Sequence, residues 1–215
     1  MLIKTYSACI ILSLLLPFAR PALAQEVEEG VEPSGLKLVV GITPKCPYGM
    51  EGCWRNARSA LLRSEQVGWV DVDADSYNCT AQLQLKNPGF PDVKALRDQF
   101  HALLGDNYVF RGVELTLQGV LESKGGKLML KPDGLEQSMA LGPLQHKLQW
   151  NFLKQRARGP EEEERIAYQQ LESKAKAGET VKVRVTGPLH ISDAGLLMEV
   201  REFFVMTPST YGQGY

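Results

Sequence analysis

The order in which strand-like and helix-like hydrophobic patterns follow one another over residues 36–111 constrains the fold most strongly. The apolar run 36–42 predicts a buried strand, and from Trp54 to Gly68 small and apolar residues recur at helical spacing. Residues 69–73 and 80–85 then alternate between polar and apolar side chains, as half-buried strands do. The first half of this region therefore predicts a strand, a helix and a hairpin.

A second helix and a further strand complete the region. Pro91 suits a first helical turn, and apolar residues recur at helical spacing up to Leu104. A long strand pattern follows over 109–121, which we divide between two domains near Arg111 and Gly112. The order strand–helix–strand–strand–helix–strand is the split β-α-β arrangement of a ferredoxin-like fold, which we expect over residues 36–111.

The next part of the chain, residues 112–206, shows a different order of patterns. Strand patterns come first, at 113–121, 128–130 and 138–141, and are followed by a helix at 161–177 and strands at 180–186 and 196–205. Three strands, a helix and two strands is the element order of an OB-fold barrel. The predicted fold class is therefore α+β, a ferredoxin-like βαββαβ domain followed by an OB-like β-barrel with one helix. Residues 207–215 are expected to form a flexible tail.

The N-terminal segment predicts export. Residues 1–24 combine the early basic residue Lys4, an apolar core at 8–16 and the small-x-small sequence 22–24, which is typical of a cleaved signal peptide. The apolar core is too short to span a hydrocarbon layer of about 30 Å. We therefore expect cleavage after Ala24, a periplasmic or secreted protein without a membrane span, and a flexible leader at 25–35.

Charge and histidine placement narrow the classes of function. The chain has 24 Lys and Arg against 25 Asp and Glu, without the basic excess of a nucleic-acid-binding protein, so we expect no nucleic-acid partner. His101 in a helix, His146 in a loop and His190 in a turn lack the spacing of metal ligands and are assigned surface or local hydrogen-bonding roles. Cys53 has neither a CxxC partner nor an evident paired histidine, so we do not expect an enzyme.

Three cysteines remain after the predicted cleavage: Cys46, Cys53 and Cys79. In the expected topology the loop after the first strand and the hairpin before the third strand lie at one end of the domain, so the three thiols should converge. An oxidising compartment favours a disulfide between some pair, and the odd count leaves one thiol over. A soft-metal site and free buried thiols are the alternatives. Cys53 is placed just before or within the first helical turn, where the thiolate is favoured.

The sequence Gly49-Met50-Glu51-Gly52-Cys53, with Ala57, Ala60, Leu61 and Val67 behind it, is similar to the heavy-metal-associated (HMA) domains of copper chaperones. In that family a Gly-Met-x-Cys-x-x-Cys loop opens the first helix. The resemblance covers residues 36–119 and implies a ferredoxin-like fold, soft-metal binding and metal transfer by ligand exchange. If Cys53 matches the family's second cysteine, Met50 stands in place of the first, and Cys46 and Cys79 have no counterpart.

These observations lead to two functional hypotheses. In the first, the protein is an exported metal-binding protein that holds Cu(I), with zinc as the competitor, at Cys46, Met50, Cys53 and Cys79. In the second, it is a non-enzymatic envelope interaction module in which the cysteines are structural. The OB-like barrel, or the face between the domains, would then recruit another envelope protein.

Overall fold

The computed structural model describes residues 35–176, 181–192 and 195–206. The expected signal peptide at 1–24, the leader up to residue 34 and the tail at 207–215 lie outside the described residues.

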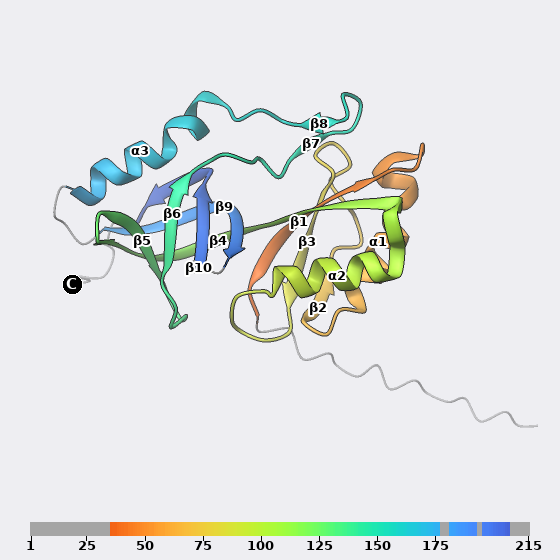
Figure 1. Cartoon of the computed structure of the whole chain (residues 1–215), viewed down its shortest axis with the longest axis horizontal. Coiled ribbons are helices and arrows are strands. Elements are labelled where there is room, and N and C mark those ends of the chain that lie inside the picture. The colour runs from red at the N-terminus through yellow and green to blue at the C-terminus, as the bar shows by residue number, and fades with distance from the viewer. Residues whose placement is uncertain (1–34, 177–180, 193–194, 207–215) are drawn as a thin grey trace, which may run out of the picture. The chain divides into compact units, whose positions relative to one another are not determined.

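The first part of the fold is a strand–helix–strand–strand–helix–strand unit (Figure 1). Its elements are β1 (Lys37–Pro44), α1 (Gly49–Leu62), β2 (Val67–Val70), β3 (Thr80–Leu85), α2 (Val93–Leu104), the short 3-10 helix η1 (Gly105–Asn107) and β4 (Tyr108–Lys124). The strands lie in the order β4-β1-β3-β2, and each neighbouring pair is antiparallel. The helices α1 and α2 contact each other and pack on β1, β2 and β4, so the apolar faces of both helices form a core with the sheet.

The helix α1 begins at Gly49, five residues before the helical pattern detected from Trp54. Met50 and Cys53 are buried on the same face of α1 as Trp54 and Ala57, so packing against the sheet extends the helix through two glycines. Gly49 itself has a positive φ of 66°, which glycine adopts without strain.

The strand β2 ends at Val70, so the prediction of a strand over 69–73 is wrong at its C-terminal end. The side chain of Asp71 accepts a hydrogen bond from the amide of Asp73 at 3.2 Å, which turns the chain out of the sheet. The indole nitrogen of Trp54 donates to the carbonyl of Val72 at 3.0 Å. The loop between β2 and β3 therefore lies against the N-terminal half of α1.

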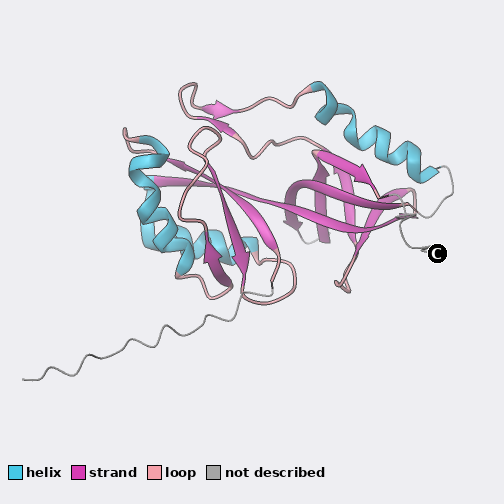
Figure 2. Cartoon of the chain, turned by 180° about the vertical axis from the view of Figure 1, so that it is seen from behind, coloured by secondary structure: helices cyan, strands magenta, loops and turns pink. Residues whose placement is uncertain are grey.

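The second part of the fold is a closed five-stranded β-barrel (Figure 2). Its further elements are β5 (Lys127–Pro132), β6 (Met139–Pro143), β7 (Trp150–Asn151), β8 (Arg156–Ala157), α3 (Glu162–Lys176), β9 (Lys182–Ser192), β10 (Gly195–Val200) and β11 (Glu202–Val205). The barrel runs β4-β5-β6-β10-β9 and closes because β9 also pairs with β4. The β6–β10 pair is parallel, and the other pairs of the ring are antiparallel. The expected α+β class and a barrel with one helix are confirmed.

The strand β4 belongs to both parts of the fold. Its 17 residues pair with β1 at one end and with β5 and β9 further along, and Val113 and Leu115 have partners on both sides. The boundary expected near Arg111 and Gly112 falls inside this strand. Gly112 lies opposite Gly41 and Phe110 lies opposite Ile42, so Arg111 is the extra residue of a β-bulge. All described residues belong to one compact unit.

Within the described part of the chain, no helix has the length and apolar character needed to cross a membrane.

Candidate metal centre

The structure joins Cys46 and Cys53 in a disulfide. Cys46 lies in the loop between β1 and α1, and Cys53 lies beyond the first turn of α1 because the helix starts at Gly49. The expectation that Cys53 lies just before or within the first helical turn is therefore wrong. A disulfide sulfur is not a thiolate, so in this oxidised form neither residue offers the ligand that a soft metal ion prefers.

The other two predicted ligands, Cys79 and Met50, are buried. The Cys79 thiol lies 3.7 Å from the carbonyl oxygen of Ser76, and burial raises its pKa against the opposing effect of the Arg111 charge. The loop that carries Cys79 meets the first turn of α1, which carries Met50, since the Ser76 hydroxyl donates to the Glu51 carboxylate at 3.3 Å. A metal site formed by Cys46, Met50, Cys53 and Cys79 stays a prediction for the reduced protein.

A different group of potential ligands comes together on the barrel: His146, His190 and Glu199. His190 lies on β9 opposite Leu197 of β10, and Glu199 is two residues further along β10, so the two side chains are diagonal neighbours on one face of the strand pair. His146 lies in the segment that follows β6. The backbone amides of Gln145 and His146 donate to Glu199 Oε2 at 2.6 and 2.8 Å, which brings this segment onto the carboxylate.

The geometry around Glu199 leaves its second oxygen facing two imidazoles. Glu199 Oε1 lies 3.0 Å from His190 Nε2 and 3.4 Å from His146 Nδ1. The Glu199 side chain is only 6% exposed, whereas that of His190 is 42% exposed and that of His146 is 79% exposed. Among the described residues, His190 Nε2 is a buried atom that makes no hydrogen bond of acceptable geometry, although it lies only 3.0 Å from Glu199 Oε1. An imidazole nitrogen in that position can offer its lone pair to a cation.

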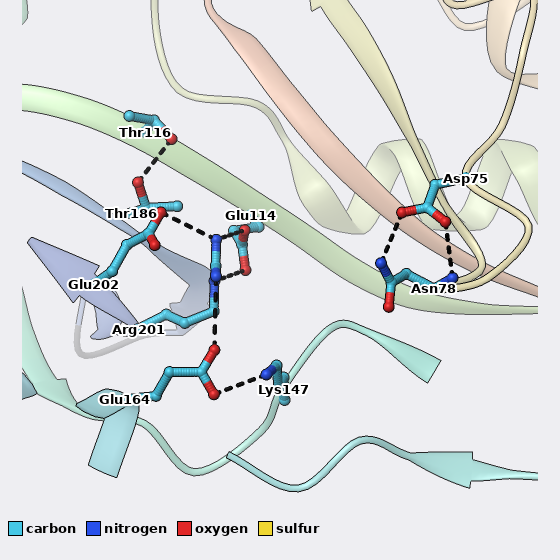
Figure 3. A network of polar contacts seen from close by, with 9 residues as sticks. All are labelled: Asp75, Asn78, Glu114, Thr116, Lys147, Glu164, Thr186, Arg201 and Glu202. Atoms are coloured by element: carbon cyan, nitrogen blue, oxygen red, sulfur yellow. Dashed lines mark hydrogen bonds and ion pairs between the residues drawn. The ribbon is translucent and has the colours of Figure 1, made fainter. Parts of the chain in front are cut away.

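The other buried carboxylates of the barrel are paired with arginine or lysine (Figure 3). Glu114 accepts two hydrogen bonds from the Arg201 guanidinium, both at 3.0 Å. Glu164 of α3 lies 2.8 Å from Lys147 Nζ and 3.6 Å from Arg201 Nη1. Glu199 differs, because within the described ranges the basic side chains next to its carboxylate are the two histidines and neither a lysine nor an arginine.

The network of Figure 3 also perturbs two carboxyl groups in opposite directions. Burial raises the pKa of Glu114, and the Arg201 charge offsets this only in part. Burial also acts to raise the pKa of Glu164, but the hydrogen bond from Lys147, the amide of Glu161 and the nearby positive charges outweigh it, so that pKa is lowered. These ion pairs attach α3 and the segment around Lys147 to the barrel.

Two imidazoles and one carboxylate form a donor set that suits a divalent transition metal ion. Ligands bound to one tetrahedral zinc ion at about 2.0–2.2 Å lie roughly 3.3 Å from one another. The separations of Oε1 from the two nitrogens, 3.0 and 3.4 Å, are close to this value, and all three donor atoms lie within 4.8 Å of one another. The exposed His146 ring can adjust at little cost, and three protein ligands leave a coordination position open.

The sequence did not predict this cluster. His146 and Glu199 are 53 residues apart, and His190 was placed in a turn, whereas β9 continues through it to Ser192. Part of the cluster could have been found from a hairpin between the two last strand patterns. If Ser192 pairs with Gly195, that register puts His190 and Glu199 on the same face of the strand pair. The position of His146 depends on a loop, which hydrophobic periodicity does not describe.

Comparison with protein-family models, curated proteins and solved structures finds no match to this chain. Function is therefore inferred from the geometry of the chain's own residues.

Proposed function

We propose that the chain is an exported protein that binds a divalent transition metal ion, such as Zn²⁺, at His146, His190 and Glu199. The observation that carries this proposal is the buried Glu199 carboxylate, which faces two imidazole nitrogens in place of a lysine or arginine among the described residues. The Cys46–Cys53 disulfide supports the exported location, because disulfides persist in oxidising compartments.

The donor set favours a different metal from the one that the cysteines suggest. Imidazole and carboxylate suit Zn²⁺, Cu²⁺ and Ni²⁺, whereas Cu(I) prefers sulfur ligands. The amides of Gln145 and His146 hold Glu199 Oε2, so that Oε1 is directed toward the imidazoles. Such hydrogen bonds to a metal-binding carboxylate orient it and raise metal affinity.

We also propose that the two parts of the fold are ferredoxin-like and OB-like. The βαββαβ order and the strand order β4-β1-β3-β2 support the first proposal. The ring β4-β5-β6-β10-β9, with α3 between β6 and β9, supports the second. The relation to HMA domains stays a proposal that rests on the sequence around Met50 and Cys53.

A competition titration of the full chain with Zn²⁺ and a chromophoric chelator tests the metal site. His146→Ala with His190→Ala should weaken Zn²⁺ binding by at least about tenfold, because two of three ligands are lost. His101→Ala is the matched control, since His101 lies on α2 outside the cluster and should leave the affinity unchanged.

A second variant separates the two candidate metal sites. Replacing Cys46, Cys53 and Cys79 by serine should leave Zn²⁺ affinity at the wild-type level. Loss of binding in the serine variant, with wild-type binding in the double histidine variant, would move the metal site to the cysteines and contradict the proposal.

The second candidate function is an envelope interaction module with a structural disulfide, and the Cys46–Cys53 bond favours it. Closing a loop of this length contributes about 2.5 kcal/mol by the chain-entropy relation. Tyr48 and Tyr77 are exposed near this loop and offer an apolar contact surface to another envelope protein. Mass mapping of freshly exported protein should find the disulfide in stoichiometric amount, and a reduced pair would count against this function.

A further inference from the structure

Both imidazoles of the cluster line a cavity of about 770 Å³ that also contacts the N-terminal half of α2 and the end of β9. Apolar side chains form much of its wall, among them Phe90, Phe110, Leu148 and Ile191. A volume of this size is typical of sites for small molecules, which combine apolar walls with a few polar groups. The proposed metal site therefore lies beside a space that a small molecule can fill.

The charges around this cavity favour an anion. Its lining contains the cationic residues Lys94, Arg97, Arg111 and Lys147 and the single carboxylate of Asp92. The Asp92 carboxylate already accepts the amide of Ala95 at the start of α2. Lys94 and Arg97 pair with the carboxylate of Asp98, and Lys147 pairs with that of Glu164, so the excess of positive charge comes from Arg111.

Arg111 adds a buried positive charge. Its guanidinium donates to the carbonyl oxygens of Leu148 and Cys79, at 3.1 and 2.6 Å, and to the Thr43 hydroxyl. Burial lowers the pKa of Arg111 to about 10, so the side chain stays protonated at neutral pH. Its hydrogen-bond partners are neutral groups, and its charge is therefore not cancelled by them.

We propose that this cavity binds a small amphipathic carboxylate, whose carboxylate group completes the coordination of the metal ion held by His146, His190 and Glu199. The apolar part of the molecule would lie against Phe90, Phe110 and Ile191, and the Arg111 charge would attract its carboxylate. This inference rests on the proposed function, because the metal ion supplies the bond to the carboxylate.

Calorimetric titration of the full chain with hexanoate, in Zn²⁺-loaded and metal-free form, tests the inference. Hexanoate should bind the loaded protein at least about tenfold more tightly than the metal-free protein, since a metal–oxygen bond is added. Hexanamide, which has the same length and no charge, should show no such difference.

The possible failures are distinguishable. If Zn²⁺ binds at the cluster but hexanoate binds equally well with and without it, or not at all, this inference is overturned and the proposed function stands. If Zn²⁺ does not bind, the proposed function is wrong, and the inferred metal–carboxylate bond is wrong with it.

Discussion

Glu199 is a buried carboxylate in which one oxygen is held by hydrogen bonds and the other is available to bind a metal ion. Its Oε2 accepts two backbone amides, so the carboxylate is held in place without a basic side chain. Its Oε1 faces His146 and His190, which provides a site for a cation. The three residue types are visible in the sequence, but their meeting depends on strand register and on one loop, so composition and spacing did not predict it.

Two substitutions at Glu199 separate its structural role from its ligand role. Glu199→Gln keeps an acceptor for the amides of Gln145 and His146 and should weaken Zn²⁺ binding with little change in stability. Glu199→Ala leaves those amides without their partner and should destabilise the protein by about 1–3 kcal/mol. Urea unfolding of the metal-free variants measures the difference, and equal stability of the two variants would contradict the role of the carboxylate as an acceptor.

Cys79 should be unreactive in the folded protein. Its side chain is buried and burial raises the pKa of its thiol, so little thiolate is present or accessible at pH 8. Iodoacetamide followed by peptide mass mapping should label Cys79 only after addition of denaturant. Rapid labelling under native conditions would show that the thiol is exposed and would contradict this prediction.

At the scale of elements, hydrophobic patterns predicted most helices and strands but missed boundaries that tertiary contacts determine. The end of α2 at Leu104 was predicted, because Gly105 follows it, but Pro91 lies before the helix, which Asp92 caps and which begins at Val93. The start of α1 was missed because Pro47, Gly49 and Gly52 are typical of loops, whereas burial of Met50 and Cys53 against the sheet extends the helix. The pattern within a segment identifies its type, but its ends depend on partners elsewhere in the chain.

The attachment of α3 to the barrel should depend on pH through Glu164. The pKa of Glu164 is lowered in the folded protein, so its contribution to stability is present above the unfolded-state pKa and is lost as the pH falls through the folded-state pKa. Glu164→Gln should therefore destabilise the protein at pH 7 and have little effect near pH 3. Urea unfolding across this range measures the change.

Glu114 provides the opposite case and serves as the control for Glu164. Its folded-state pKa is raised, so its protonation contributes stability at acidic pH that is lost as the pH rises through that pKa. The destabilisation by Glu114→Gln should therefore become smaller as the pH rises, whereas that by Glu164→Gln becomes larger. The same pH profile for both variants would contradict the assigned directions.

At the scale of the whole molecule, β4 connects the helix-covered part of the sheet with the barrel (Figures 1 and 2). The sequence pattern over 109–121 was assigned to two domains, yet a single strand pairs with β1 on one side and β9 on the other. The alternation of polar and apolar residues along a strand does not show which strands pair with it. A strand shared by two parts of a fold and a boundary between two domains therefore look alike in sequence.

The sharing of β4 predicts cooperative unfolding. Val113 and Leu115 are buried and pair with both β1 and β9, so separating either part removes support from the other. Urea unfolding followed by tryptophan fluorescence and by circular dichroism should give one coincident transition. Two separate transitions would show that the parts fold independently.

The most direct test of the metal site is a crystal structure of the full chain grown with Zn²⁺, with anomalous scattering measured at the zinc edge. A zinc ion bound at the proposed site should give an anomalous peak about 2.0–2.2 Å from Glu199 Oε1, His146 Nδ1 and His190 Nε2. An empty position between these three atoms at saturating Zn²⁺, or a zinc ion bound at the cysteines in its place, would contradict this expectation.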